Sequence, residues 1–151
     1  MNATTLNTPK GNVRILTTDT TVMSIEFCGD CKNEGQSTAI SSQCIRELKE
    51  YFTGTRKTFS VSLDSSLGTP FQKAVWNAMK EIPYGEVVTY GELAKRAGYP
   101  KAVRAVGSAC KKNPFPFIVP CHRVLPADKS LGGYAGGAEM KKWLLDIEKK
   151  F

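Results

Sequence analysis

The spacing of apolar residues changes partway along the chain, and this change decides which fold class the sequence can adopt. Early in the chain, apolar and polar residues alternate, as at Met23, Ile25 and Phe27, which is typical of half-buried β-strands. After residue 69 the apolar residues recur every three or four positions, which is typical of amphipathic helices. The sequence therefore predicts an α+β fold, with a small N-terminal sheet followed by a mainly helical part.

The first part of the chain is expected to combine three strands with one helix. Strands are predicted over residues 13–17 and 22–27, and a third over residues 59–63, where every second residue is apolar. Apolar residues at helical spacing predict a helix over residues 39–52, which Gly54 ends.

The turn-rich segment 64–68 marks the expected boundary between two domains, because the apolar pattern and the charge both change there. Residues 1–66 are assigned to an N-terminal structural domain and residues 67–151 to a C-terminal domain. No stretch approaches the ~18 consecutive apolar residues that a membrane span needs. The chain also begins without a basic and then apolar leader, so we expect a cytoplasmic protein.

Four helices are expected after this boundary. They follow Thr69-Pro70, the capping box from Thr89 to Glu92, Pro100, and the glycine-rich segment that ends at Gly137. The second and third are short and are separated by a tight turn that contains Gly98, and the third is basic. This pair resembles a helix-turn-helix.

The net positive charge of the chain lies entirely in its C-terminal part. Residues 1–68 hold seven of the 21 basic residues and seven of the 14 acidic residues, so the net charge of +7 arises after them. No acidic residue occurs between Glu92 and Asp128. A local excess of this kind attracts a polyanion, most commonly nucleic acid, although a solvated basic face has the same composition.

The single histidine of the chain, His122, directly follows Cys121. A free thiol with a pKa near ~8.5 is mostly protonated at neutral pH, and a nearby imidazole or cation can activate it. Three prolines within residues 114–120 exclude a helix there and hold the chain before Cys121 extended. Cys121 is therefore a candidate nucleophile, although side chains that are adjacent in an extended chain point apart unless the backbone bends.

Residues 132–137 form a glycine-rich loop around one aromatic residue, Tyr134. Such a loop allows the backbone to approach a flat ligand closely, although a flexible surface loop has the same composition. Its glycines do not have the spacing of either common nucleotide-phosphate motif, so a phosphate cradle is excluded.

Taken together, these segments resemble the O6-alkylguanine-DNA alkyltransferase family, also called methylated-DNA–protein-cysteine methyltransferases. The resemblance rests on Pro120-Cys121-His122-Arg123-Val124, and on residues 83–87, 102–107, 113–114 and 133–137, which follow in the family's order. Residues 1–68 carry no such motif.

The resemblance implies a DNA repair protein that flips O6-alkylguanine out of the duplex and transfers the alkyl group to its own Cys121. A thioether offers water no leaving group, so the transfer is irreversible and the protein acts once. The implied partner is double-stranded DNA that carries the lesion. The chain is expected to be a monomer and to need neither a cofactor nor a metal.

The resemblance also implies the role of individual residues. His122 would act on Cys121 through a water and would be oriented by Glu148. Tyr90 would donate a hydrogen bond to guanine N3, and Asn113 would hold the active-site turn. Substrate contacts are expected from Tyr134 and Gly136 and from the backbone of Val124 and Ala135. DNA contacts are expected from Thr89, Lys101, Ala102, Arg104, Ala105, Gly107 and Arg123, with Arg104 filling the space that the flipped base leaves.

Two features depart from the family pattern. Ala135 stands where many members have serine, so we expect altered affinity or inhibitor sensitivity rather than lost activity. Vertebrate members bind zinc, whereas here Cys28 and Cys31 form half of a zinc-like pattern without a second pair. Structural zinc is therefore not expected, and a disulfide and two free thiols both stay open.

Three other interpretations compete with this one. A non-enzymatic alkyltransferase-like protein would bind the damaged DNA but typically has Trp in place of the reactive cysteine. A thiol hydrolase with a Cys-His pair would turn over repeatedly. A plain helix-turn-helix regulator would leave the motif around Cys121 unexplained.

Overall fold

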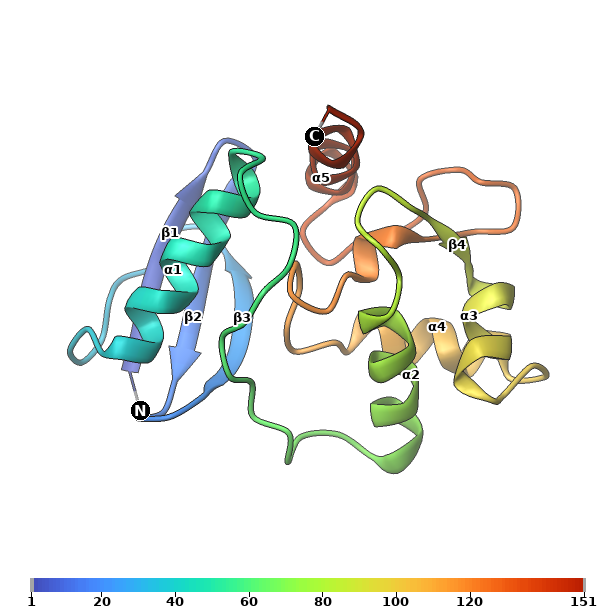
Figure 1. The fold of residues 1–151 in the computed structure, drawn as a ribbon, viewed down its shortest axis with the longest axis horizontal. Coiled ribbons are helices and arrows are strands. Elements are labelled where there is room, and N and C mark those ends of the chain that lie inside the picture. Colours follow the sequence, from blue (N-terminus) through green and yellow to red (C-terminus); the bar gives the residue numbers. More distant parts are fainter. Residues whose placement is uncertain (1, 151) are drawn as a thin grey trace.

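The N-terminal unit of the computed structural model, which describes residues 2–150, is a three-stranded sheet covered on one face by a helix (Figure 1). Strands β1 (Asn2–Thr8), β2 (Gly11–Thr17) and β3 (Val22–Cys28) are antiparallel and lie in the order β1-β2-β3. Helix α1 (Ala39–Phe52) packs on β2 and β3. The helix predicted over residues 39–52 and the two strands predicted on either side of residue 20 are confirmed.

The side chains that α1 and the sheet bury follow from the register of the strands. Ile15 of β2 pairs with Ile25 of β3, and both side chains are buried. Leu48 of α1 is also buried, one helical turn from Cys44, which faces the same core. Helix α1 begins at Ala39 because Thr38 accepts a hydrogen bond from the backbone N–H of Ser41 in a capping box.

The strand predicted over residues 59–63 is wrong. This segment makes only one isolated bridge to the sheet, between Val22 and Leu63. The backbone N–H groups of Ser60 and Val61 instead donate to the carboxylate of Glu47, which lies buried on α1. A side chain thus takes the place of a neighbouring strand, and the ring of Phe59 packs on that of Tyr51 of α1 at 5.4 Å between ring centres.

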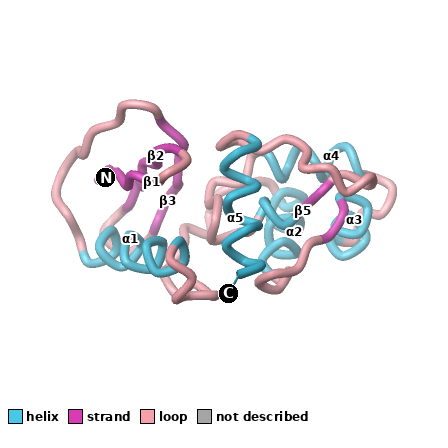
Figure 2. Tube along the Cα trace, turned by 90° about the horizontal axis from the view of Figure 1, so that it is seen from above, coloured by secondary structure: helices cyan, strands magenta, loops and turns pink. Residues whose placement is uncertain are grey.

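The C-terminal unit consists of helices and one short, two-stranded parallel sheet. Its elements are α2 (Pro70–Lys80), β4 (Val88–Thr89), α3 (Tyr90–Ala97), α4 (Val103–Lys111), the 3-10 turn η1 (Cys121–Arg123), β5 (Val124–Leu125) and α5 (Ala138–Lys150). Strand β4 pairs with β5, which places the residues after Cys121 beside the start of α3. Helix α5 lies between the sheet unit and helices α2 to α4 (Figure 2).

Capping residues set the ends of these helices as the sequence predicts. Thr69 and Thr89 each form a capping box with the residue three positions later, and Gly98 ends α3 in the left-handed conformation, with φ of 90°. The predicted third helix begins two residues later than expected, at Val103, because Ala102 is not helical and caps no N–H with its side chain. None of the helices within residues 2–150 is long and apolar enough to cross a membrane.

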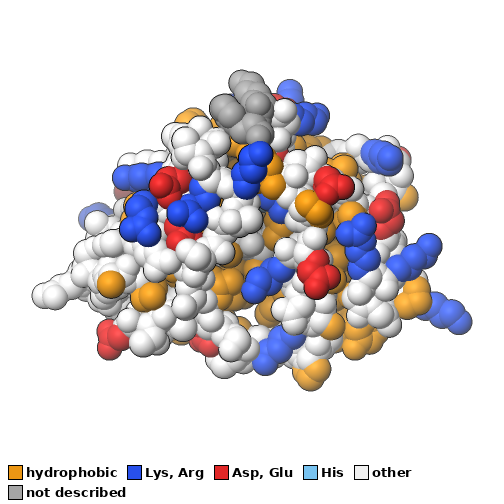
Figure 3. Space-filling view, viewed as in Figure 1, with side chains coloured by type: hydrophobic (Ala, Val, Ile, Leu, Met, Phe, Trp, Pro, Cys, Tyr) orange, Lys and Arg blue, Asp and Glu red, His pale blue; other side chains and the backbone are white. Residues whose placement is uncertain are grey.

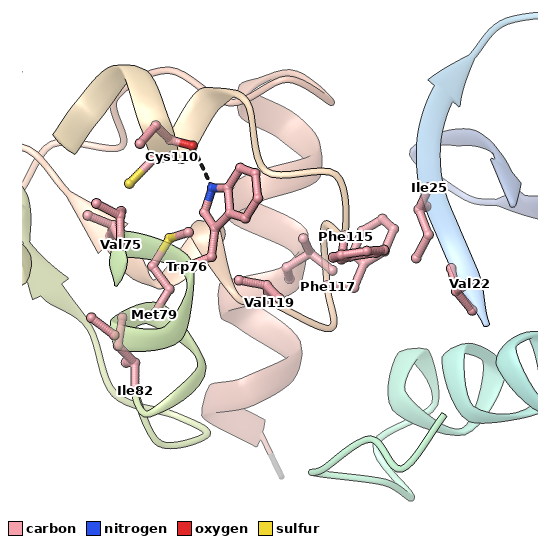
Figure 4. Packing of buried hydrophobic residues seen from close by; sticks show 14 of the residues in the cluster. Val22, Ile25, Val75, Trp76, Met79, Ile82, Cys110, Phe115, Phe117 and Val119 are labelled. Atoms are coloured by element: carbon pink, nitrogen blue, oxygen red, sulfur yellow. Dashed lines mark hydrogen bonds between the residues drawn. The ribbon is translucent and has the colours of Figure 1, made fainter. Parts of the chain in front are cut away.

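One hydrophobic core continues through both units (Figure 4). Val22 and Ile25 of β3 face Phe115 and Phe117 of the segment that precedes Cys121, and the backbone N–H of Ile25 donates to the carbonyl of Pro114 at 2.8 Å. Trp76 of α2 anchors the other side of this core and donates from Nε1 to the carbonyl of Ala109 at 2.9 Å. The sheet therefore packs directly against the segment that presents Cys121.

Candidate active site

A cavity of about 300 Å³ opens where the two units meet, and Cys121 lies in its wall. The C-terminal unit contributes Tyr90, Asn113 and Tyr134 to the lining. Strand β3 contributes Ile25, Glu26 and Phe27, which the sequence analysis did not assign to any site. The cavity is thus built by both units, although all of the motifs lie in one of them.

The segment before Cys121 is held in place by Asn113. The amide of Asn113 donates to the carbonyl of Val119 at 2.8 Å, and its oxygen accepts the N–H of Phe115 at 3.0 Å. Cys121 then begins the 3-10 turn η1, so the backbone bends there rather than continuing extended. This bend supplies the departure from an extended chain that adjacent Cys and His side chains need.

The surroundings of the Cys121 thiol affect its pKa in opposite directions. Burial raises the pKa, because the thiolate loses solvation. A hydrogen bond from Asn113, the positive charge of Lys141 and the backbone N–H groups of Cys121 and His122 lower it. The thiol therefore depends on a base within the protein to become a nucleophile at neutral pH.

His122 is fully buried and is oriented by Glu148. Its Nε2 lies 2.6 Å from Glu148 Oε2. Burial lowers the pKa of His122, although the carboxylate opposes this shift, so the imidazole is neutral. We assign the proton to Nε2, because only an N–H there can donate to the carboxylate. Nδ1 then carries the free lone pair, and it accepts no hydrogen bond from residues 2–150.

Glu148 accepts hydrogen bonds from four residues. Besides His122, these are Tyr51, whose hydroxyl donates at 2.5 Å, Arg123, whose Nε and Nη2 donate at 2.9 and 3.1 Å, and the backbone N–H of Gly85 at 3.0 Å. These donors overcome the effect of burial and lower the pKa of Glu148 to about 2. The carboxylate therefore stays ionised and holds the orientation of His122.

Tyr51 belongs to α1, in the N-terminal unit, and the sequence analysis did not identify it as a site residue. Its side chain is fully buried, and its hydroxyl lies 3.1 Å from His122 Nε2 as well as close to Glu148. The sequence gives no local signal for this role, because 97 residues separate Tyr51 from Glu148. Tyr51 lies at the end of the apolar face of α1, so its position in the sequence predicts an ordinary aromatic residue of the core.

Lys141 is a second residue that the sequence analysis missed. It is fully buried on α5, and its ammonium donates to the carbonyl of Val124 at 2.8 Å. Lys141, Leu144 and Glu148 are spaced by three and four residues, so they share one face of α5. The sequence signal that could have identified Lys141 as a buried residue is its position on the apolar face of the predicted last helix.

The expected substrate-binding residues divide into two groups. Tyr134 and Ala135 line the cavity, and the Tyr134 ring packs edge-on against Phe27 at 5.6 Å between ring centres. Val124 and Gly136 are not part of the lining, and their contact with the substrate, which for Val124 is expected from the backbone, stays a prediction. Val124 is fully buried in the core, with its carbonyl bonded to Lys141.

Gly136 instead allows the loop to pack against the sheet. A Cβ atom there would lie 2.6 Å from the ring of Phe27, which is closer than such contacts permit. Its small size therefore serves the contact between the glycine-rich loop and β3.

Most of the basic residues expected at DNA lie on the surface around α3 and α4. Lys101 and Arg104 are exposed, as is Ala105, and Ala102 is partly exposed. Figure 3 shows Lys and Arg side chains projecting from the end of the molecule formed by α3 and the turn after it. Thr89 caps the N-terminus of α3, where its hydroxyl accepts a hydrogen bond from the backbone N–H of Glu92 at 3.1 Å.

Two of the residues expected at DNA have other positions. Arg123 is buried, donates to Glu148 and donates from Nη1 to the carbonyl of Ile82 at 2.6 Å, so the prediction that it binds DNA is wrong. A basic residue in a motif does not reveal its burial, and this one neutralises a carboxylate. Gly107 faces the ring of Tyr90, which would lie 3.9 Å from an added Cβ.

Cys28 and Cys31 are joined by a disulfide at the end of β3. Of the possibilities that the sequence left open, the structure therefore has the bonded pair. The bond lies beside the glycine-rich loop, in a shallow hollow that Gly136 also lines.

Comparisons with known proteins agree on one family. A model described as "6-O-methylguanine DNA methyltransferase, DNA binding domain" matches residues 70–150, and one described as "6-O-methylguanine DNA methyltransferase, ribonuclease-like domain" matches residues 1–65. The methylated-DNA–protein-cysteine methyltransferase of Methanosarcina acetivorans is 57% identical over 103 residues, which span 68% of this chain and 65% of that protein. A protein of Acanthamoeba polyphaga mimivirus, named as a probable methylated-DNA–protein-cysteine methyltransferase, is 44% identical over 148 residues, 96% of this chain and 95% of its own length.

A solved structure is similar over nearly the whole chain. The crystal structure of Mycobacterium tuberculosis OGT in complex with DNA is 38% identical, covers 97% of this chain and 91% of its own, and superposes with a TM-score of 0.87. Both units are therefore matched together.

Proposed function

Because the chain belongs to the O6-methylguanine DNA methyltransferase family, we propose that it repairs DNA by transferring an alkyl group from guanine O6 to Cys121. The observation that carries this proposal is the arrangement around the thiol. Cys121 lines the cavity, and the neighbouring His122 is held by a buried, ionised Glu148 at 2.6 Å. A nucleophile next to a base, with the base oriented by a third group, is the arrangement that thiol alkylation needs.

In the proposed reaction, His122 Nδ1 accepts the thiol proton, through a water as the family resemblance implies. The Cys121 sulfur then attacks the alkyl carbon, so a C–S bond forms while the bond between that carbon and guanine O6 breaks. The electron pair of that bond leaves with guanine as an anion. Glu148 stabilises the imidazolium that forms, because its lowered pKa keeps it negative.

Tyr90 is proposed to assist the leaving guanine. Tyr90 lines the cavity, and burial together with the nearby thiols raises the pKa of its hydroxyl, so the hydroxyl remains protonated. A protonated phenol can donate a hydrogen bond to guanine N3 and stabilise the developing anion. Tyr134 and the backbone N–H of Ala135 are proposed to hold the flat base in the cavity.

DNA is proposed to bind at α3 and α4, which would act as a helix-turn-helix. The exposed Arg104 lies in the first turn of α4 and the exposed Lys101 two residues before the helix, and the small Ala102 and Ala105 would allow the duplex to approach closely. The guanine must leave the base stack, because its O6 cannot reach a thiol in a cavity otherwise. Arg104 is proposed to fill the space that the base leaves.

The proposed functions are divided between the two expected domains, residues 1–66 and residues 67–151. Residues up to 66 would supply a wall of the cavity and the Tyr51 hydroxyl, and the remainder would supply the thiol, its base and the DNA surface. Binding of damaged DNA without transfer is not favoured as the function, because Cys121 is present together with its base.

A stoichiometric assay tests the proposal. The protein is mixed with an excess of a duplex that contains one O6-methylguanine, and the restored guanine is counted by digestion and chromatography. We expect the amount of guanine restored to equal the amount of protein added and then to stop. Continued product formation would indicate a hydrolase, and no product despite binding would indicate a damage-binding protein.

A further inference from the structure

The cavity that contains Cys121 is lined by a second thiol, Cys110. Cys110 lies in the last turn of α4 and is 5% exposed. The proposed alkyl transfer uses Cys121 alone, so it gives Cys110 no part. The cavity of about 300 Å³ therefore contains one thiol that the proposed reaction uses and one that it does not.

The same few groups contact both cysteines. The backbone N–H of Asn113 donates to the carbonyl of Cys110 at 3.3 Å, and the Asn113 side chain lowers the pKa of the Cys121 thiol. Cys110 also lies one turn after Gly107, on the face of α4 that is turned towards the Tyr90 ring. Asn113 and Tyr90 also line the cavity together with both cysteines.

The two thiols differ in their capacity to ionise. Burial and the charge of Cys121 raise the pKa of Cys110 to about 12, while Lys141 opposes this shift. Cys110 has no imidazole beside it, so it stays a thiol at neutral pH and does not compete for the alkyl group. Attack on a sulfenic acid in the same cavity then proceeds through the small thiolate fraction of Cys110.

The remaining cysteines do not share this cavity. Cys28 and Cys31 are bonded to each other, and Cys44 is buried on α1, with Glu47 nearby. Within residues 2–150, Cys110 is the free thiol that lines the same cavity as Cys121.

We propose that Cys110 is a resolving thiol, which forms a reversible disulfide with Cys121 when Cys121 is oxidised by a hydroperoxide. In the first step the Cys121 sulfur attacks the peroxide, so that an S–O bond forms, the O–O bond breaks and water or an alcohol leaves. In the second step the Cys110 sulfur attacks the resulting sulfenic acid. The S–S bond forms, the S–O bond breaks, and the hydroxyl leaves with the Cys110 proton as water.

The disulfide has two consequences for repair, which rest on the proposed function of Cys121. While it exists, Cys121 cannot form the thiolate that attacks the alkyl carbon. It also prevents further oxidation of Cys121 to sulfinic acid, which thiols do not reverse. Because the protein acts once, each molecule saved from sulfinic oxidation preserves one repair event.

The test compares the wild-type protein with Cys110→Ser and with the matched control Cys44→Ser, which removes a buried free thiol outside the cavity. Each is treated with hydrogen peroxide, and one half is digested without reduction for peptide mapping. The other half is treated with dithiothreitol, and methyl transfer is measured relative to the same protein before oxidation. Unfolding midpoints show whether each variant is folded.

In the wild type and Cys44→Ser we expect a peptide pair joined through Cys110 and Cys121, with a loss of about 2 Da. Most of the lost transfer should return on reduction. In Cys110→Ser we expect a gain of about 32 Da on Cys121, with at least about tenfold less activity recovered.

Absence of the joined pair from the oxidised wild type would overturn the proposal, as would equal recovery in Cys110→Ser. The peptide map does not depend on catalysis and does not need the variants to fold. If the unoxidised protein transfers no methyl group, the proposed function fails, while the map still decides whether the two thiols pair.

Discussion

The two units of this molecule contrast in what their sequences reveal and in what they contribute to the site. The C-terminal unit holds every recognisable motif and all of the net charge, and it supplies Cys121, His122 and Glu148. The N-terminal unit is neutral and carries no motif, yet β3 forms a wall of the cavity and Tyr51 donates to Glu148. Motifs thus mark the groups that we propose make and break bonds, whereas the groups that hold them in position can lie in ordinary strands and helices.

Two buried glutamates, one in each unit, differ in the same way as the units themselves. Glu47 in the N-terminal unit accepts hydrogen bonds from the backbone N–H groups of Ser60 and Val61, and Glu148 accepts a hydrogen bond from His122, the proposed base. Hydrogen bonds lower the pKa of both carboxyls against the effect of burial. The first is expected to serve folding alone, and the second to serve both folding and chemistry.

The largest effect is expected for Glu148→Gln, with Glu47→Gln as the control. An amide cannot balance the buried Arg123 or stabilise an imidazolium, so we expect transfer to fall by about a hundredfold. Glu47→Gln should lower stability without changing the rate constant of the folded protein. Rates are measured in single-turnover assays with each variant below its unfolding midpoint, and equal rates for the two variants would break the comparison.

Comparison of the wild type with Glu148→Gln should also reveal a pH dependence of the free energy of unfolding. The folded pKa of Glu148 is lowered from 4.5 to about 2, so its contribution is fully present above pH 4.5 and is lost as the pH falls towards 2. A shift of this size corresponds to about 3 kcal/mol. The free energy of unfolding of the wild type should therefore approach that of Glu148→Gln over this range, and a constant difference would contradict the assignment.

Arg104→Ala should separate DNA handling from chemistry. The variant loses the side chain proposed to support the flipped base, so we expect repair of duplex DNA to slow by about thirtyfold. Alkylation by free O6-benzylguanine should be nearly unchanged, because a free base needs no extrusion. Arg46→Ala, which removes an exposed arginine from α1, is the control. Equal losses on both substrates would show that Arg104 acts in folding or catalysis.

A smaller effect on chemistry is expected for Tyr51→Phe, which removes one hydroxyl from the N-terminal unit. Without this donor Glu148 accepts a proton more readily and holds His122 less firmly, so transfer to free O6-benzylguanine should slow by about tenfold. The loss should grow as the pH is lowered. Tyr84→Phe is the matched control, because the Tyr84 hydroxyl bonds to no group within residues 2–150. A Tyr51→Phe rate equal to that of Tyr84→Phe at every pH would confine Tyr51 to packing.

The smallest effect is expected for the double substitution Cys28→Ser, Cys31→Ser. Opening so short a loop should cost about 2 kcal/mol of stability or less, because little chain entropy is released. The bond lies outside the cavity lining, so the transfer rate should not change. Thermal unfolding and single-turnover rates measure the two quantities, and a lost rate at full stability would show that the site is misplaced.

Local signals explain how much of the fold the sequence could predict. Capping residues such as Thr69, Thr89 and Gly98 act within a few positions, so the helices that they border were predictable within about two residues. Strand β1 was missed because its sequence, rich in threonine and asparagine, has little alternation. Its strand conformation depends on pairing with β2, which a local pattern does not contain.

The site could be predicted where its residues are adjacent or carry the family resemblance. The structure brings His122 and Glu148 together as expected, although 26 residues separate them. Tyr51 and the β3 wall were not predictable, because their positions arise from packing between distant segments. Arg123 was placed at DNA because its charge was visible in the sequence, whereas its burial against Glu148 was not.

The central claim is that Cys121 accepts the alkyl group, and tandem mass spectrometry after reaction with O6-methylguanine duplex tests it most directly. We expect one added methyl group, about 14 Da, on the peptide that contains Cys121 and none on the peptide that contains Cys110. Cys121→Ala should bind the damaged duplex without gaining mass. A methyl group on another residue, or restored guanine with no methylated protein, would contradict the account.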